Sequence, residues 1–278
     1  MDSYSAIITN VGHFMKGGET VGKLKIGFFD SGVGGISVMT AARRVLPDAE
    51  YIYYADEAHV PYGTKPHEEI IRYADEAVSC LASHGVDAVV VACNTATSIA
   101  IEYLREKYDL PIIGMEPALK PAVRSHPNEK ILLCATPVTI AGEKLHHLIE
   151  KSGAEPTLVP LPGLVAFAEQ GVFDKETVCE YLAEEIGNER DFAAVVLGCT
   201  HFSFFRDCFR ELFGERVDIV DGNVGTVKRL VSVLGDKIDD CCAESGSVRY
   251  FISGEEADSG KIVLFESLAA RYERVLNI

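Results

Sequence analysis

The chain has 278 residues, of which 47% are hydrophobic and 24% charged, and its formal net charge is −16. This composition excludes a disordered protein, and the length suffices for one large or two medium domains. The acidic charge argues against a nucleic-acid partner, because phosphate binding needs concentrated Lys and Arg. No stretch approaches the roughly 20 apolar residues that span a bilayer, so no membrane partner is expected.

Residues 1–23 contain only a short apolar patch, Ala6-Ile7-Ile8, which is too short for a secretory signal. We interpret them as an N-terminal extension without chemistry. The eight cysteines are then most simply reduced thiols in a cytoplasm. No Cys-x-x-Cys pair and no His/Cys spacing of a zinc site occurs, so no metal is expected.

Short apolar runs that indicate buried strands alternate along the chain with helical patterns. The expected strands are 25–29, 51–54, 88–92, 111–114, 131–134, 157–160, 193–197 and 217–220. The expected helices include 66–83, 98–108, 139–151 and 175–186. The tail 247–265 is expected to form two short strands around a turn at 254–260, followed by a last helix. This alternation predicts an α/β fold with mostly parallel sheets flanked by helices.

Two cysteines, Cys93 and Cys199, each follow an apolar run and precede a helical pattern. Ligands of open α/β sheets bind at the carboxyl ends of the strands. Free N–H groups at a helix start also favour a thiolate. A buried cysteine is otherwise an inert small hydrophobe, and this is our interpretation of Cys80, Cys134, Cys179 and Cys208. We therefore predict that Cys93 and Cys199 face one ligand from two sides and exchange protons with it.

The same 106-residue offset that separates Cys93 from Cys199 relates Asp30 to Thr136, and each of these also ends a strand and enters a helix. Two such coincidences predict two similar α/β halves. We expect a first domain made of 24–117 and 221–278, a second domain made of 118–220, and an active site in the cleft between them.

The segment Asp30-Ser31-Gly32-Val33-Gly34-Gly35 indicates a strand, a glycine-rich turn and a helix start, which would let the backbone approach a ligand closely. Its spacing does not fit the dinucleotide fingerprint, and no lysine motif suggests pyridoxal, so no cofactor is expected. The plain alternative is a tight turn with Asp30 or Ser31 as a helix cap.

Other polar residues are ambiguous on their own. His201 is either an acid/base partner of Cys199 or a structural histidine, and Glu169 would ordinarily be a solvated charge. Pro61-Tyr62-Gly63 would by itself indicate only a loop.

Taken together, these residues make the sequence similar to the glutamate racemases of the aspartate/glutamate racemase superfamily. The resemblance runs from about Lys23 to near the C-terminus. The matching segments are 29–35, 61–63, 92–96, 114–118, 135–136 with Thr139, and 198–201. The resemblance implies a cofactor-independent isomerase that interconverts L- and D-glutamate and supplies D-glutamate for bacterial peptidoglycan. A homodimer is left open, because oligomeric state varies among similar enzymes.

The resemblance also implies roles for single residues. Cys93 and Cys199 match the catalytic thiols, Asp30 and His201 the auxiliary groups that flank them, and Glu169 an acidic residue beside the second thiol. The residues that match substrate contacts are Asp30, Ser31, Pro61, Tyr62, Gly63, Asn94, Thr95, Thr136, Thr139, Thr200 and His201.

The residues after the two cysteines, Ala96-Thr97 and His201, favour glutamate over aspartate within the superfamily. Two segments depart from its pattern. Residues 202–205 read Phe-Ser-Phe-Phe where Tyr-Pro-Leu is usual, and Asp221-Gly222-Asn223 stands where an Asp with a small hydroxyl residue is common. The first departure bears on the packing behind Cys199.

Three alternatives stay open. An aspartate or hydantoin racemase would share the thiol pair. A hydrolase could use Cys199 as a nucleophile with His201, although it gives no reason for a second thiol. A non-catalytic binding protein would be expected to lack one of the key cysteines, and both are present.

Overall fold

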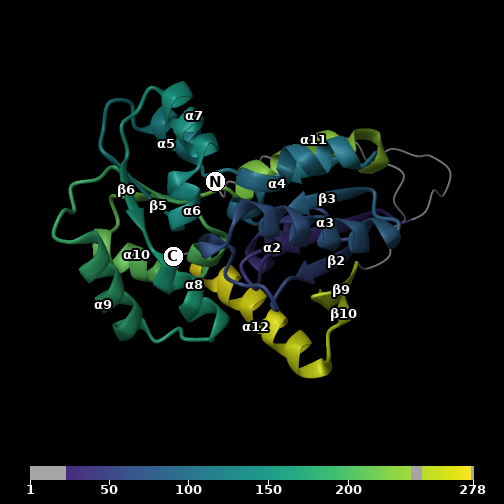
Figure 1. Cartoon of the computed structure of the whole chain (residues 1–278). Coiled ribbons are helices and arrows are strands. Elements are labelled where there is room, and N and C mark those ends of the chain that lie inside the picture. The colour runs from purple at the N-terminus through teal and green to yellow at the C-terminus, as the bar shows by residue number, and fades with distance from the viewer. Residues whose placement is uncertain (1–22, 239–245, 277–278) are drawn as a thin grey trace.

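The structure is a computed structural model that describes residues 23–238 and 246–276 (Figure 1). The predicted N-terminal extension, apart from Lys23, and the pair Cys241 and Cys242 lie outside the described residues. None of the helices in the described ranges has the length and apolar character that crossing a bilayer requires.

One sheet has six strands in the order β10-β9-β2-β1-β3-β4, and all neighbours are parallel except β9 and β10. Its strands are β1 (Lys25–Asp30), β2 (Glu50–Ala55), β3 (Ala88–Val91), β4 (Ile112–Gly114), β9 (Ser247–Ile252) and β10 (Glu255–Glu256). Its helices are α2 (Ile36–Val45), α3 (His67–Ser83), α4 (Asn94–Lys107), α11 (Asn223–Leu234) and α12 (Ser259–Leu276). Successive residues of a strand face opposite sides, so Phe28 packs in the cluster with α2, α11 and α12, whereas Phe29 packs in the cluster with α3 and α4.

The other sheet has four parallel strands in the order β6-β5-β7-β8. They are β5 (Ile131–Ala135), β6 (Thr157–Pro160), β7 (Ala194–Leu197) and β8 (Asp218–Asp221). The surrounding helices are α5 (Leu119–Ser125), α6 (Pro137–Ala141), α7 (Glu143–Ser152), α8 (Pro162–Glu169), α9 (Lys175–Ile186) and α10 (Arg206–Phe213). The order β6-β5-β7-β8 repeats β2-β1-β3-β4 of the first sheet. The predicted α/β fold with two similar halves is confirmed.

Three elements differ from the prediction by more than one residue. Helix α4 begins at Asn94 rather than 98, because the Cys93 side chain accepts a hydrogen bond from Ala96 N and caps it. The stretch 139–151 is two helices, interrupted at Gly142, whose backbone is extended. The C-terminal turn lies at Ser253 and Gly254 rather than at 254–260.

This turn is tight because Ser253 and Gly254 both have positive φ, 46° and 96°. Helix α12 then begins at once, since the Asp258 carboxylate accepts from Lys261 N at 2.9 Å and acts as its cap. The strand β10 is therefore only two residues long.

The chain crosses between the two sheets twice, and the two crossings touch. It leaves the first sheet after Gly114 and returns after Asp221 to form α11, which packs on α2, β3 and β4. A Cβ at Gly222 would lie 2.7 Å from the Glu116 carbonyl oxygen. One hydrophobic cluster also runs through residues of both sheets. The domain boundaries at 117/118 and 220/221 stay predictions.

Gly222→Ala is expected to lower the free energy of unfolding by about 1–3 kcal/mol, because its new methyl group meets backbone that cannot move aside easily. The backbone at Gly222 (φ −78°, ψ −6°) suits alanine, so the contact alone is tested. Gly225 is the matched control: it lies inside α11 in open space, and Gly225→Ala should stabilise by roughly 0.5–1 kcal/mol. Urea unfolding measures both, and equal stabilities would contradict the tight contact of the crossings.

Candidate active site

The first predicted thiol lies where β3 ends and α4 begins. Cys93 Sγ accepts a hydrogen bond from Ala96 N at 3.4 Å, and the thiol is 3.5 Å from Ser31 Oγ, to which it donates. Ser31 follows β1, the parallel neighbour of β3, so the carboxyl ends of two adjacent strands bring these side chains together. Both residues are buried.

Burial and, to a smaller extent, the nearby Asp30 charge raise the pKa of Cys93 to about 12, although the Ala96 N–H and Ser31 act in the opposite direction. The prediction that the helix start favours a thiolate is therefore wrong in its net outcome for Cys93. The N–H group acts as expected, but loss of hydration in the interior outweighs it. At neutral pH Cys93 holds its proton and is placed to donate it.

The second thiol belongs to a chain of three side chains. Cys199 follows β7, and its Sγ lies 3.7 Å from His201 Nδ1. The other ring nitrogen, Nε2, lies 2.6 Å from Oε1 of Glu169, the last residue of α8. Burial alone would lower the pKa of His201, but the contacts with Cys199 and Glu169 raise it well above its usual value. A protonated His201 between a thiol and a carboxylate can pass a proton to Cys199.

Asp30 lies between the surroundings of Cys93 and those of Cys199, and it is fully buried. Its Oδ1 accepts from Gly32 N at 2.9 Å, and its Oδ2 accepts from Thr200 Oγ1 at 3.1 Å. Burial raises the pKa of Asp30, and the charge of His201 opposes this rise. The carboxylate thus links the strand end that carries Ser31 to the turn that carries Cys199.

The glycine-rich turn after β1 packs closely against the second half of the molecule. A Cβ at Gly32 would lie 1.9 Å from Glu169 Oε1, and one at Gly34 would lie 2.2 Å from Thr200 Oγ1. Val33 N donates to the same Glu169 oxygen at 2.9 Å. Sequence reasoning missed this backbone donor, because its partner is 136 residues away.

Three threonine hydroxyls form a second contact between the halves. Thr95 Oγ1, in the first turn of α4, lies 3.0 Å from Thr136 Oγ1 and 3.3 Å from Thr139 Oγ1, and these two are 3.0 Å apart. Gly63 packs directly on Thr136. A cluster of buried hydroxyls at strand ends can donate several hydrogen bonds to a carboxylate.

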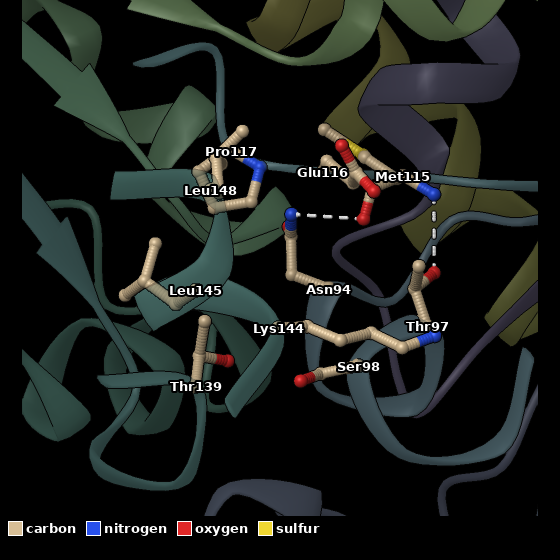
Figure 2. Close-up of a pocket in the computed structure, with 10 residues that line it drawn as sticks. All are labelled: Asn94, Thr97, Ser98, Met115, Glu116, Pro117, Thr139, Lys144, Leu145 and Leu148. Atoms are coloured by element: carbon tan, nitrogen blue, oxygen red, sulfur yellow. Dashed lines mark hydrogen bonds between the residues drawn. The ribbon is translucent and has the colours of Figure 1, made fainter. Parts of the chain in front are cut away.

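Some residues that were predicted to contact the substrate have other partners or are exposed to solvent. Asn94 Nδ2 donates to the Met115 carbonyl at 3.4 Å, and its buried Oδ1 has no hydrogen-bond partner among the described residues. Figure 2 shows Asn94 and Thr139 at the edge of a pocket between α4 and α7. That pocket measures about 20 Å³, far too little for an amino acid. Pro61 is exposed, and the Tyr62 hydroxyl donates to Asp56.

Both departures from the family pattern meet at Asp221. Its Oδ2 accepts from Ser203 Oγ at 3.2 Å, and its Oδ1 accepts from Asn223 N at 3.1 Å. The phenylalanines around Ser203 are fully buried. The departures therefore form one packed unit behind Cys199.

Comparison with known proteins identifies the family. A sequence model described as Asp/Glu/Hydantoin racemase matches residues 37–230. The chain belongs to this family. The glutamate racemase of Halothermothrix orenii is 47% identical to it over 248 residues, 88% of this chain and 93% of that protein. Glutamate racemase 2 of Bacillus subtilis is 42% identical, with 92% and 96% covered. The predicted identity of the chain as an amino-acid racemase of glutamate racemase type is confirmed.

Solved structures of glutamate racemases have a similar fold to this chain. Escherichia coli glutamate racemase, in complex with L-glutamate and the activator UDP-MurNAc-ala, has a TM-score of 0.76 at 28% identity, covering 90% of this chain and 96% of that one. The Thermus thermophilus glutamate racemase, bound to β-chloro-D-alanine, has a TM-score of 0.72 at 30% identity, with 90% and 93% covered. The roles of single residues stay predictions.

Asp30→Asn is expected to lower the pKa of Cys93, because it removes a negative charge that disfavours the thiolate. Alkylation of Cys93 by iodoacetamide, followed by mass spectrometry of its peptide over a pH series, should then begin at lower pH than in the wild type. Cys134 is the control: burial alone raises its pKa, so its labelling profile should not move. An unchanged profile for Cys93 would contradict the electrostatic coupling.

Proposed function

We propose that this chain interconverts L- and D-glutamate without a cofactor, by proton transfer at the α-carbon between Cys93 and Cys199. The observation that carries the proposal is the equivalent placement of the two thiols, each at the carboxyl end of the third strand of its half, with Asp30 and Thr200 joined between them. Glutamate as substrate is supported by the names of the relatives and by the L-glutamate complex of the E. coli enzyme.

Inversion of an α-carbon requires a base on one face and an acid on the other. In the protonation state described above, Cys93 is the acid that returns a proton. Cys199 takes the α-proton as the base, and His201, which Glu169 orients, lies 3.7 Å from its Sγ and can exchange a proton with it. Turnover leaves the two thiols in exchanged states, so the opposite enantiomer is processed in the reverse direction.

The α-proton of an amino acid is weakly acidic because the adjacent carboxylate resists further negative charge. Fixed donors around that carboxylate lower the barrier, since they need no reorganisation as charge develops. The hydroxyls of Thr95, Thr136 and Thr139 supply such donors. Close packing of the two halves excludes water and strengthens these interactions.

The product, D-glutamate, would serve bacterial peptidoglycan synthesis in the cytoplasm. A homodimer stays a prediction. Glutamate is distinguished from aspartate by incubating the purified protein with each L-enantiomer, without added cofactor, and following the circular dichroism of the amino acid. Loss of the circular dichroism signal with L-aspartate but not with L-glutamate would refute the assigned substrate.

Cys93→Ala and Cys199→Ala are each expected to reduce racemisation by more than about 1,000-fold, because each removes the acid or base for one face. The serine variants should retain a trace. Cys80→Ala is the control, since Cys80 lies on the outer part of α3 and should be dispensable. Full turnover by either alanine variant would contradict the two-thiol mechanism.

Turnover in D₂O is expected to place deuterium at the α-position of each product enantiomer, because the returning proton comes from a thiol that exchanges with solvent. Proton NMR of the recovered glutamate measures this. Racemisation with retention of the original proton would contradict transfer through two thiols.

The chain Cys199–His201–Glu169 also has the arrangement of a nucleophile, a base and an orienting carboxylate. A hydrolase acting through it would form a covalent adduct on Cys199. Intact-protein mass spectrometry during turnover distinguishes the two, and the racemase is expected to show no added mass.

A further inference from the structure

We propose that Asp56 is a positioning residue that fixes the segment Pro61–Gly63 beside Thr136 of the second half, by holding the hydroxyl of Tyr62. The inference rests on the proposed function, because it concerns how that site holds its substrate. Nothing in the sequence pattern singled out Asp56.

Asp56 is a buried carboxylate whose oxygens are engaged by three side chains. It is 2% exposed and directly follows β2, and its backbone N–H donates to the Asp30 carbonyl at 3.0 Å. Its Oδ2 accepts from the Tyr62 hydroxyl at 2.6 Å. Its Oδ1 accepts from His59 Nδ1 at 2.8 Å and from Ser253 Oγ at 3.0 Å. Such charge-assisted bonds are short and strong, and they compensate for burial of the charge.

The Tyr62 hydroxyl cannot donate a hydrogen bond to a ligand while it donates to Asp56. Burial and then the Asp56 charge raise the pKa of Tyr62 far above its usual value, so the phenol keeps its proton and donates it to the carboxylate. The ring packs between Phe29 and Tyr73, with centroids 6.2 and 6.0 Å away. What this segment presents to the opposite half is therefore its backbone at Gly63, which packs on Thr136.

The other two donors to Asp56, His59 and Ser253, connect the loop between β2 and Tyr62 to other parts of the chain. The His59 ring stacks on Tyr73 of α3, with centroids 3.7 Å apart and planes 13° from parallel. Ser253 lies in the turn between β9 and β10, and its Oγ also accepts from Ala58 N at 3.0 Å. The loop between β2 and Tyr62 is thus held from both sides by elements that take no part in the proton transfer.

If Asp56 acts through Tyr62, loss of their hydrogen bond should weaken substrate binding more than it slows chemistry, because the thiols and their partners lie on other turns. The equilibrium constant of racemisation is one, so kcat/KM must fall by the same factor for both enantiomers. The informative quantity is therefore the division of that loss between KM and kcat.

The experiment compares Tyr62→Phe, Asp56→Asn and the double variant. Tyr62→Phe should raise KM for both enantiomers by about 10-fold, the usual effect of losing a hydrogen bond to a charged group, with a smaller change in kcat. Asp56→Asn should raise KM at least as much, and the double variant no further than Asp56→Asn alone, since both changes remove one interaction. Tyr62→Phe keeps the ring packing, so the test stands even where Asp56→Asn folds poorly.

Tyr51→Phe is the matched control. Tyr51 lies on β2 and its buried hydroxyl donates to the Leu46 carbonyl at 2.7 Å, so the variant loses a buried tyrosine hydrogen bond that does not involve Asp56 or the segment Pro61–Gly63. It should lower the melting temperature with KM unchanged. A purely structural role for Asp56 would give the same pattern in Tyr62→Phe, and that result would overturn the inference.

The two proposals fail differently. Wild-type protein that racemises glutamate, with variants of unchanged KM or additive effects, overturns the positioning role alone. Wild-type protein that does not racemise glutamate refutes the proposed function. In that case the dissociation constant of D-glutamate, measured by calorimetry on the wild type and the same variants, is used in place of KM. The inference is overturned as well if the wild type does not bind D-glutamate, or if the variants bind it as tightly as the wild type.

Discussion

The shared Glu169 carboxylate is the interaction on which the geometry of the site depends. Its Oε1 accepts from Val33 N in the first half and lies 2.6 Å from His201 Nε2 in the second. The same atom therefore holds the halves together and orients the imidazole beside Cys199. The turn can approach so closely only because Gly32 has no side chain.

Burial then decides the electrostatics, and it competes with local hydrogen bonding. At Cys93 the loss of hydration outweighs the Ala96 N–H, and the pKa rises. At His201 the balance is reversed, because two direct partners outweigh burial. A buried charge is stabilised where several partners face it, and His201 has two such partners, Cys199 and Glu169.

The strands and the two thiols were predictable from sequence, because apolar runs and strand-end positions are local signals. The offset relating Asp30 to Thr136 likewise predicted two similar halves, and the strand order of one half repeats in the other. The tertiary partners were not predictable. Ser253 reaches Asp56 across 197 positions of the chain, and Glu169 reaches Val33 across 136. Nothing local marks such contacts, although Asp56 ends a strand as Asp30 does, and that shared position could have drawn attention to it.

The two halves repeat the same strand order, yet they surround their thiols differently. Cys93 has a helix N–H and Ser31 as neighbours, whereas Cys199 has the pair His201 and Glu169. A racemase tolerates this asymmetry because its equilibrium constant of one constrains only the ratio kcat/KM to be equal for both enantiomers. The separate values of kcat and KM are free to differ. The repeated strand order thus places one thiol at the same strand end in each half, and the two thiols differ in the side chains around them.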